Sequence, residues 1–422
     1  MRTFIILWLG QLASSLGSAM TYFALTLWMW QQTQSATAIA LIVVFYQLPQ
    51  IAITPLSGIL VDRISRKTLL GLSDTGAACC TVAIGILSAF QLLQVWHIYL
   101  IASIIGCMGN IQSLTYTTVI PTLVPKQHHT RAGSMGALLG YGAAIIAPAL
   151  AGMLYPHIAL PGITAIDGVT FMIAIATLIG VKIPRPPQEP VNTSDPERQK
   201  LWGDLTFGFR YIAAHPNLLA MVAAMSSFSF LNQISETLYQ PMVLARTGGN
   251  TQTLGIVVAA YGVGGVAGSL LFSIWGGLRS RPLAILVGFM GAGCSQILLG
   301  VSQLSTLWMA ARLGAAFCAP LRGSAYMAVW YAKVEPKFQG RVFSADYLIG
   351  TVVLVLANRV AGPLADRLFE PWMQYKITPL TPLFGSTPGS GMALLQVLLG
   401  VGIVAIGAIG LVVIQQRRRK VP

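Results

Sequence analysis

The sequence predicts an all-α polytopic membrane protein of about twelve transmembrane helices, arranged as two pseudo-symmetric six-helix bundles. Three observations predict this fold class. Only 9% of the 422 residues are charged, whereas a soluble domain carries roughly 25%. Apolar runs of about 20 residues, which is the length that crosses a bilayer as a helix, recur along the whole chain. The runs show no strand-like alternation over segments of about 10 residues, which a membrane barrel would require.

The apolar runs define the expected helices in chain order. They lie at 4–30, 38–60, 68–90, 98–120, 132–155, 163–183, 218–244, 254–278, 282–304, 306–331, 340–364 and 391–414. A longer polar stretch separates the sixth run from the seventh. We therefore expect an N-terminal bundle at 1–183, a cytoplasmic linker at 184–217, and a C-terminal bundle with a basic tail at 218–422.

The second part of the linker carries apolar residues at helical spacing. These are Leu201, Leu205, Phe209 and Ile212. Such a stripe beside polar residues is typical of a helix that lies on a membrane surface. We expect an amphipathic helix there, from about 199 to 214.

The basic residues fix the expected orientation. Most of the 26 lysines and arginines fall in alternate loops, in the linker and at the two ends of the chain, and the remaining loops hold few. Lys and Arg of short loops stay on the cytoplasmic side. Both termini are therefore expected in the cytoplasm. The net charge of +14 is explained by this topology, so nucleic acid is not an expected partner.

The loop between the second and third runs carries the most specific motif. It places Gly58 four residues before Asp62-Arg63, followed by Ser65-Arg66-Lys67. The loop resembles the cytoplasmic signature of the major facilitator superfamily, with Ser65 in the position of a usual Gly. The resemblance implies a conformational latch made by Gly58, Asp62, Arg63, Arg66 and Lys67. Gly58 allows close helix packing, and Asp62 can favour a helix N-terminus.

Other segments extend the resemblance over essentially the whole chain. They are Trp8-Leu-Gly10-Gln11, the loop Gln339–Ser344, and Ala361–Arg367. Together they look like the branch that holds enterobactin exporters and macrolide efflux pumps. The last segment ends in Asp366 and Arg367, on the outer side in the predicted topology. It mirrors the signature loop, which gives the hypothesis of an outer latch; the alternative is an outer helix cap.

The fifth run contains small residues around a proline. They are Ala143, Ala147, Pro148, Ala151 and Gly152. The series resembles an exporter-associated motif of the family, with Ala replacing three glycines. Small residues at this spacing form a tight helix seam, and the proline bends the helix. Ordinary helix packing is the alternative explanation.

Ionisable residues inside membrane helices are costly and indicate function by default. The candidates are Asp74, Asp167, Glu236, Arg312, Arg322, Asp346 and Arg359. Three of them, the aspartates, can instead be structural pairs near helix ends. Asn232, Glu236 and Gln240 share one helix face at four-residue spacing, with Tyr239 beside them. A carboxyl group shielded from water can exchange protons near neutral pH, so our hypothesis makes Glu236 the proton-coupling acid. Arg312 or Arg322 would be its partner or a contact for an anionic substrate.

The family resemblance implies that the first, fourth, seventh and tenth helices line a central cavity. The polar residues on these runs are therefore the substrate candidates: Gln11, Ser18, Tyr22, Asn110, Gln112, Tyr116, Asn232, Tyr239, Gln240, Arg312, Arg322 and Tyr326. One departure bears on the mechanism. Drug antiporters of the family often carry an Arg in the fourth helix, and 98–120 has none. Proton coupling by that route is therefore not indicated.

The resemblance implies a secondary active transporter of a bacterial inner (plasma) membrane. We expect a monomer embedded in membrane lipid that exports an amphipathic small molecule, such as a drug, a macrolide or a siderophore-like product, and exchanges it for protons by alternating access. An uptake permease is the first alternative and a polytopic membrane enzyme the second. The sequence shows neither a nucleotide loop nor a metal-ligand pattern, so we expect no enzyme, no cofactor and no metal. The five cysteines lie in apolar runs and fit small core residues.

Overall fold

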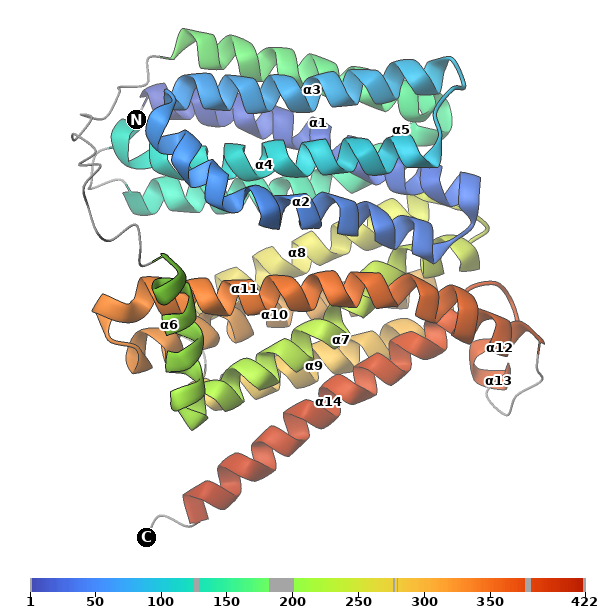
Figure 1. Ribbon diagram of the computed structural model, residues 1–422. Helices are drawn as coiled ribbons and strands as arrows, with labels where there is room; N and C mark the ends of the chain where they lie inside the picture. The colour runs from blue at the N-terminus through green and yellow to red at the C-terminus, as the bar shows by residue number, and fades with distance from the viewer. Residues whose placement is uncertain are drawn as a thin grey trace. The chain divides into compact units, whose positions relative to one another are not determined.

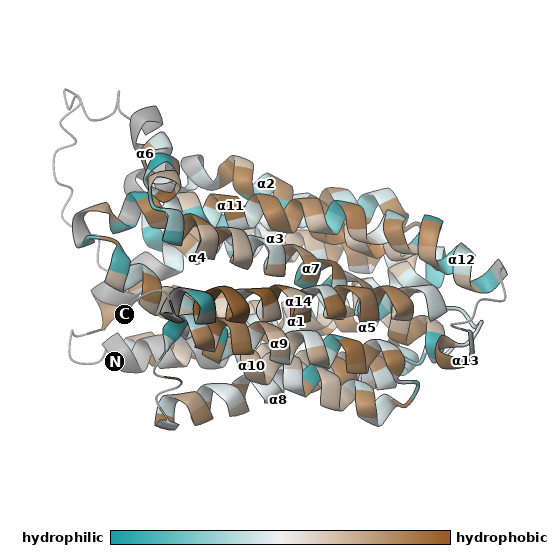
Figure 2. Ribbon diagram, turned by 90° about the horizontal axis from the view of Figure 1, so that it is seen from below, coloured by the Kyte–Doolittle hydropathy of each residue, from teal (hydrophilic) through white to brown (hydrophobic). Residues whose placement is uncertain are grey.

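The computed structural model describes residues 2–124, 129–181, 201–275, 278, 280–375 and 381–419. Helices make up almost all of these residues (Figure 1), which confirms the predicted all-α class. Hydrophobic colour covers most of the length of α9 and α14 in Figure 2, and α6 and α12 carry more hydrophilic residues. The cytoplasmic position of the two termini stays a prediction.

The elements follow one another as listed here: α1 Arg2–Thr33, α2 Ala36–Arg63, α3 Arg66–Ala89, α4 Val95–Leu123, α5 His129–Gly180, α6 Leu201–Ala214, α7 Pro216–Arg246, α8 Thr251–Trp275, α9 Arg281–Val301, α10 Ser305–Lys333, α11 Pro336–Pro363, the π-helical η3 Leu364–Phe369, α12 Glu370–Tyr375, α13 Thr381–Phe384 and α14 Ser390–Arg419.

Ten helical stretches of the described chain are long and apolar enough to cross a membrane. Two features reconcile this number with the expected twelve. First, α5 is 52 residues long and breaks at Ala159, whose φ of 51° and ψ of −166° are non-helical, so it contains both the fifth and the sixth predicted helices. Second, α10 is 29 residues long and carries Arg312 and Arg322 within it, and it is not among the ten. Despite its polar residues, α10 is long enough to span a bilayer.

The described residues form two compact units. One joins the chain up to Glu189 with Val243–Ala259, and the other joins Pro190–Met242 with the chain from Ala260 onward. We call them unit 1 and unit 2. The predicted boundaries at 183 and 218 stay a prediction.

Unit 1 is built mainly by α1 to α5, and the first part of α8 belongs to it. Its closest contacts occur where a glycine of one helix meets its neighbour: a Cβ added at Gly10 would lie 3.2 Å from Ala174 Cα, and one added at Gly106 would lie 2.1 Å from the backbone oxygen of Tyr46. Helices in lipid gain stability mainly from such close packing, because lipid chains are as apolar as the side chains. Small residues therefore position α1 on the second half of α5 and α4 on α2.

Unit 2 is built mainly by α7, α9, α10, α11 and α14. Phe228 of α7 stacks on Phe289 of α9 with ring centroids 4.4 Å apart, and both side chains are buried. At Gly293 and Gly400, α9 and α14 approach so closely that an added Cβ would lie 2.7 Å from the other glycine's backbone oxygen. The apolar core and these glycines hold the polar residues of α7 in a fixed frame.

The linker helix α6 packs on α11. A Cβ at Gly208 would lie 2.4 Å from the backbone oxygen of Arg341, and the ring of Phe207 lies 5.1 Å from that of Phe338. Of the predicted apolar stripe, Ile212 is buried and Phe209 is exposed. The side chains of Leu201 and Leu205 lie outside the described residues. The face of α6 that contacts α11 thus coincides only in part with the predicted apolar stripe.

Gly106 offers a direct test of the close packing. We expect Gly106→Ala to lower stability by about 1–3 kcal/mol, because the new methyl group overlaps the backbone of α2. Gly142→Ala is the matched control, since among the described residues no atom outside the adjoining backbone of its own helix lies within 4 Å of a Cβ at that position. Thermal unfolding of the purified protein in detergent measures both. Equal unfolding temperatures for the two variants would contradict the packing argument.

Candidate functional site

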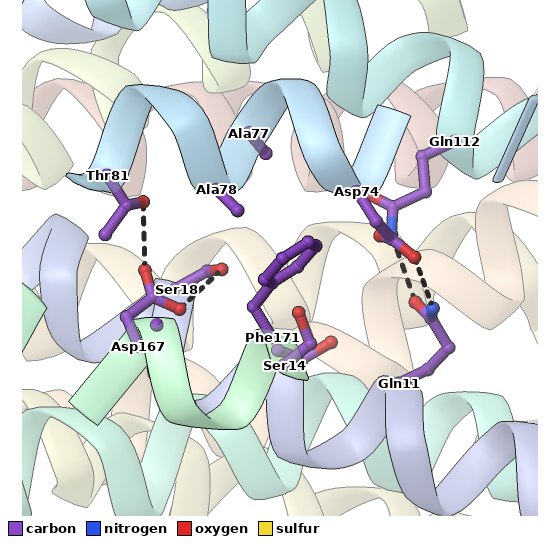
Figure 3. Close-up of a pocket in the computed structure, with 12 residues that line it drawn as sticks. Gln11, Ser14, Ser18, Asp74, Ala77, Ala78, Thr81, Gln112, Asp167 and Phe171 are labelled. Atoms are coloured by element: carbon purple, nitrogen blue, oxygen red, sulfur yellow. Dashed lines mark hydrogen bonds between the residues drawn. The ribbon is translucent and has the colours of Figure 1, made fainter. Parts of the chain in front are cut away.

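Unit 1 encloses a polar cavity of about 120 Å³ between α1, α3, α4 and the second half of α5. Figure 3 shows Asp74 near one end of it and Asp167 near the other, with Ser14, Ala78 and Phe171 between them. Both aspartate residues are 3% exposed. The cavity therefore joins two acids that lie 93 positions apart in sequence.

Asp74 is held by two carboxamides. Gln11 Nε2 donates to Asp74 Oδ2 at 3.1 Å, and Gln112 Nε2 donates to Asp74 Oδ1. Gln112 Nε2 also lies 3.1 Å from Gln11 Oε1. The structure thus brings together two of the predicted substrate candidates, on α1 and α4, around a carboxylate of α3. Their amide groups point at this acid, which explains why polar residues are tolerated there.

Asp167 is held by three hydroxyl groups. Ser18 Oγ donates to its Oδ1 at 3.3 Å. Thr21 Oγ1 and Thr81 Oγ1 donate to its Oδ2 at 2.9 Å and 3.1 Å. Gly17 makes this arrangement possible, since a Cβ there would lie 2.9 Å from Asp167 Cα. The glycine lets α1 approach closely enough for its hydroxyl groups to reach the acid.

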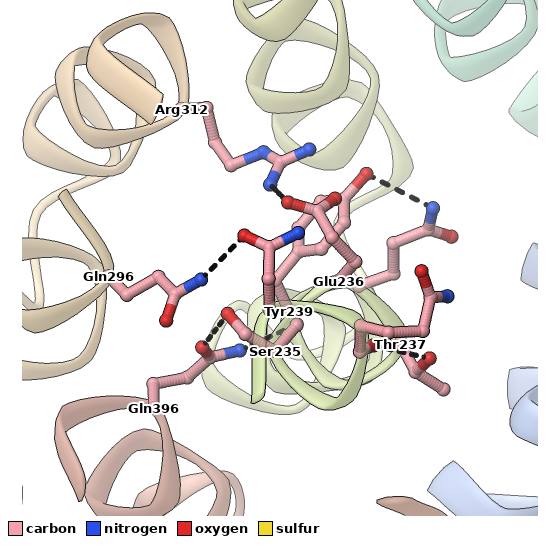
Figure 4. A network of polar contacts seen from close by, with 10 residues as sticks. Ser235, Glu236, Thr237, Tyr239, Gln296, Arg312 and Gln396 are labelled. Carbon is pink, nitrogen blue, oxygen red and sulfur yellow. Dashed lines mark hydrogen bonds and ion pairs between the residues drawn. The ribbon is translucent and has the colours of Figure 1, made fainter. Parts of the chain in front are cut away.

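Unit 2 contains an ion pair inside its helices. Arg312 Nη1 of α10 donates to Glu236 Oε1 of α7 at 2.6 Å, and the two side chains are 5% and 24% exposed, respectively. The Arg312 guanidinium also lies over two rings, 3.8 Å from the centroid of Tyr239 and 4.4 Å from that of Tyr261. Figure 4 shows the Arg312 head group beside Glu236, at the edge of the polar network of α7. The two members of the predicted couple therefore meet.

Amide and hydroxyl contacts tie the same stretch of α7 to three neighbours. Gln296 of α9 donates to Asn232 Oδ1 at 3.0 Å. Ser235 bonds Gln396 of α14. Gln233 Nε2 donates to Asn358 Oδ1 of α11 at 3.0 Å, and Thr237 Oγ1 donates to the same oxygen at 2.6 Å. The polar residues of α7 thus have a structural role that the sequence did not reveal, and Asn232 belongs to it.

The other candidates of unit 1 are dispersed. Asn110 bonds Ser57 and Thr54 of α2, at 2.8 Å and 3.2 Å. Tyr22 is 43% exposed. Tyr116 packs among buried apolar residues, and its hydroxyl group is buried without a hydrogen-bond partner among the described residues. These three side chains therefore do not join the cavity of Asp74 and Asp167.

The remaining candidates of unit 2 also have separate contacts. Arg322 lies 4.2 Å above the ring of Phe228, so Arg312 and not Arg322 is the partner of Glu236. Tyr326 donates from its hydroxyl group to Asp346 Oδ1 at 2.6 Å. Gln240 Nε2 donates to Tyr239 Oη at 3.1 Å. Arg359 is exposed.

The signature loop joins α2 to α3. Ser65 is the N-cap of α3, and its hydroxyl oxygen accepts from Thr68 N. Lys67 Nζ donates to the backbone oxygens of Ile179 and Val181 at 2.8 Å each, at the C-terminal end of α5. The side chains of Gly58, Asp62 and Arg63 lie outside the described residues. The described part of the predicted latch therefore binds the end of α5 within unit 1.

The predicted seam of α5 is buried at all five positions. Gly152 and Pro148 face the start of α8: a Cβ at Gly152 would lie 2.6 Å from Thr251 O, and one at Gly255 would lie 2.5 Å from Pro148 O. Thr251 Oγ1 donates to the backbone oxygen of Gly152 at 3.0 Å. The seam therefore accommodates another helix at backbone contact.

The predicted outer latch lies in η3. Asp366 is half-buried and Arg367 is exposed, in a π-helical turn that interrupts the end of α11. The next acidic residue, Glu370, accepts from the backbone nitrogens of Met392 and Gly389 at 2.8 Å and 3.1 Å. This buried carboxylate caps the beginning of α14. The sequence does not mark Glu370 as a cap, because its partners are backbone groups about twenty positions away.

Sequence analysis also missed Tyr261 of α8 and Gln296 of α9. Both contact a candidate residue of α7 or α10, and only the packing of the helices brings them there. The described residues contain no group of three or more His, Cys, Asp or Glu that could hold a metal ion. The described sites of units 1 and 2 can therefore interact with a substrate or a proton through hydrogen-bonding and charged groups.

Long apolar helices in two units, with polar networks buried among them, define a multi-pass membrane transporter. The family model described as Major Facilitator Superfamily matches residues 7–357, and the chain belongs to that family. It is a transporter of a small molecule in a bacterial membrane, and not an enzyme. The family resemblance, the fold class and the membrane location predicted from the sequence are confirmed.

Two curated relatives are efflux or resistance proteins. Macrolide efflux protein A of Streptococcus pyogenes is 24% identical over 369 residues, which cover 86% of this chain and 90% of that protein. The class E tetracycline resistance protein of Escherichia coli is 26% identical over 275 residues, which cover 63% of this chain and 62% of that one. Among solved structures, a bacterial homologue of the human lysosomal transporter Spinster, inward-facing and unoccupied, has a TM-score of 0.70 at 14% identity and covers 97% and 95% of the two chains.

Lys67 tests the local role of the signature loop. We expect Lys67→Ala to destabilise the contact of α3 with the end of α5 by about 1 kcal/mol, because two C-terminal carbonyl groups lose a cationic donor. Hydrogen exchange at the backbone amides near 178–181 should become faster. Lys333→Ala, at an exposed position in the last turn of α10, should leave this exchange unchanged. Unchanged exchange in Lys67→Ala would show that the lysine does not hold α5.

Proposed function

We propose that this transporter exports an amphipathic small molecule in exchange for protons, and that Glu236 is the proton-coupling acid. The observation that carries the proposal is the Glu236–Arg312 ion pair, whose two charged groups lie 2.6 Å apart on two membrane helices. An intramembrane ionisable pair marks a transport or proton pathway by default. The pair supports the sequence hypothesis, which names Glu236 and an arginine as partners.

The surroundings of Arg312 make the pair switchable. Protonation of Glu236 removes one charge, and an unpaired cation in a membrane helix is then costly. The rings of Tyr239 and Tyr261 lie 3.8 Å and 4.4 Å from the guanidinium and stabilise it by cation–π attraction, each by about 0.5–2 kcal/mol. The arginine therefore keeps a favourable environment in both states of the acid. Glu236 is the more exposed partner, so a proton or a substrate reaches it first.

Export is supported by two observations. The curated relatives named above are a macrolide efflux protein and a tetracycline resistance protein. The buried small residues of α5 also fit the exporter-associated motif that the sequence resembles. Uptake is the alternative direction, and neither of these two observations favours it.

The substrate class follows from the polar groups of unit 2. The two tyrosine rings beside Glu236 suit a cationic or neutral amphipathic molecule, such as a macrolide or another drug. Arg322 on Phe228 offers a contact for an acidic group, as in a siderophore-like product. We place the protein in the bacterial inner (plasma) membrane as a monomer that exchanges its substrate for protons, with both termini cytoplasmic.

Glu236→Gln is the main test. We expect the variant to lose proton-driven efflux of erythromycin from proteoliposomes by at least about tenfold, since the amide cannot exchange a proton, while erythromycin binding changes by less than about threefold, because a factor of three is under 1 kcal/mol. Radiolabelled efflux with and without an uncoupler measures the first, and equilibrium binding measures the second.

Glu335→Gln is the matched control. Glu335 is an exposed residue of unit 2 just before α11, so its variant should transport like the wild type. Unchanged uncoupler-sensitive efflux in Glu236→Gln would refute the assignment of the coupling acid. Accumulation of erythromycin against the expected direction would instead support the uptake alternative.

Asp366 tests the outer latch. We propose that Asp366 and Arg367 stabilise one conformation and that the signature loop, Gly58 to Lys67, stabilises the opposite one. Asp366→Asn should then shift the inward-to-outward ratio in spin-label distance distributions by at least about threefold, and a threefold shift corresponds to about 0.6 kcal/mol. Asn217→Asp, at an exposed position at the start of α7, is the control for a change of charge. An unaltered distribution in Asp366→Asn would leave Asp366 as a helix-end residue.

A further inference from the structure

Asp167 lies in the second half of α5 and is not part of the Glu236 mechanism. The residue, with its carboxyl group, is 3% exposed, within a helical stretch that is apolar enough to span the membrane. Such a group is costly to ionise unless an opposite charge lies nearby. The surrounding residues therefore determine whether Asp167 is protonated or ionised.

No cation faces Asp167 in the described structure. The cavity lining contains no Lys, Arg or His, and Asp74 is its other titratable residue. On the neighbouring helices the described Lys, Arg and His side chains are near helix ends, as with Lys67 of α3 and His97 of α4. The other ionisable side chains there are tyrosines and cysteines, such as Tyr22 of α1 and Cys80 of α3, which carry no positive charge. The ion pair described in the structure, Glu236–Arg312, belongs to unit 2. Neutral donors alone must therefore stabilise the carboxyl group.

The donors of Asp167 differ in kind from those of Asp74. Ser18, Thr21 and Thr81 present hydroxyl groups, which both donate and accept hydrogen bonds. An ionised Asp167 accepts from all three, and a protonated one donates to a hydroxyl group that turns around. The contacts survive in both states. Asp74 instead receives amide N–H groups on both oxygens, and a protonated Asp74 would lose one of these contacts.

The cavity also gives a proton access to Asp167. Its volume of about 120 Å³ has room for several water molecules, and its polar walls supply their partners. Ser18, which bonds Asp167, is an exposed residue of α1. A buried acid with a reversible hydrogen-bond shell, beside a polar cavity lined in part by an exposed residue, has the parts of a proton-binding site.

We propose that Asp167 is a second proton-binding residue of the transporter, located in unit 1, and that its proton is exchanged during the transport cycle. The second half of the proposal rests on the proposed proton-coupled function. The step moves one proton between the carboxyl group and cavity water, and no bond to carbon forms or breaks. Ser18, Thr21 and Thr81 act as positioning residues that keep the acid bound in both states.

Infrared spectroscopy of the purified full chain in lipid nanodiscs tests proton binding without a substrate. Difference spectra between acidic and alkaline pH should contain a carboxylic C=O band that Asp167→Asn removes and Glu236→Gln retains. Thr21→Val should shift the frequency of this band, because it deletes one hydrogen-bond partner. Thr26→Val is the matched control: Thr26 is equally buried on α1 but bonds Tyr22 O of its own helix, so the band should not move.

The outcomes separate this inference from the proposed function. A spectrum of Asp167→Asn that keeps every wild-type band would overturn the proposal. Should Asp167→Asn fold poorly, an identical band frequency in Thr21→Val and Thr26→Val would overturn it as well. In proteoliposomes, the number of protons counted per erythromycin should fall in Asp167→Asn, and an unchanged ratio would refute the exchange. Wild-type transport that ignores a pH gradient would refute the proposed function and the exchange, and the infrared result would still decide proton binding.

Discussion

Inside a membrane helix no bulk water solvates a charged side chain, and this constraint shapes both units of the protein. The ionised form of a carboxyl group is stabilised there only by a counter-charge, by directed hydrogen bonds or by a polar cavity. All three means of stabilisation are present. Glu236 has a guanidinium at 2.6 Å, Asp74 has two carboxamides, and Asp167 has three hydroxyl groups beside a cavity. The chemistry available to each acid follows from the kind of partner it has.

Close helix packing is what brings these partners within reach. Serine and threonine side chains are short, so α1 can bond Asp167 only because Gly17 removes the Cβ that would separate the helices. In the same way, Gly293 and Gly400 let α9 and α14 meet at their backbones, next to the polar network of α7. Helix packing and hydrogen bonding are therefore coupled in this fold, because the small residues that give dispersion contacts also set the hydrogen-bond distances.

The buried polar groups of α7 serve two purposes. Asn232, Ser235 and Thr237 bond α9, α14 and α11, which fixes the helix in unit 2. Glu236 points instead to an arginine held between tyrosine rings. A well-anchored helix that carries one exchangeable charge suits a mechanism in which protonation changes a single contact while the frame around it stays intact.

The sequence by itself determined the fold class, the number of helices and the family. Helix length and charge placement report directly on lipid, which acts on every residue of a span, and the signature loop is local in sequence. The sequence also predicted that Glu236 would have an arginine partner, but Arg312 and Arg322 are both intramembrane arginines of α10, so only the tertiary structure decided between them. It also showed that Asn232 is a contact to α9, that Asp74 and Asp167 share a cavity, and that Tyr261 stands over Arg312. These facts depend on which faces of distant helices meet, and that is set by small residues and side-chain shape in three dimensions, which the periodicity of one helix does not contain.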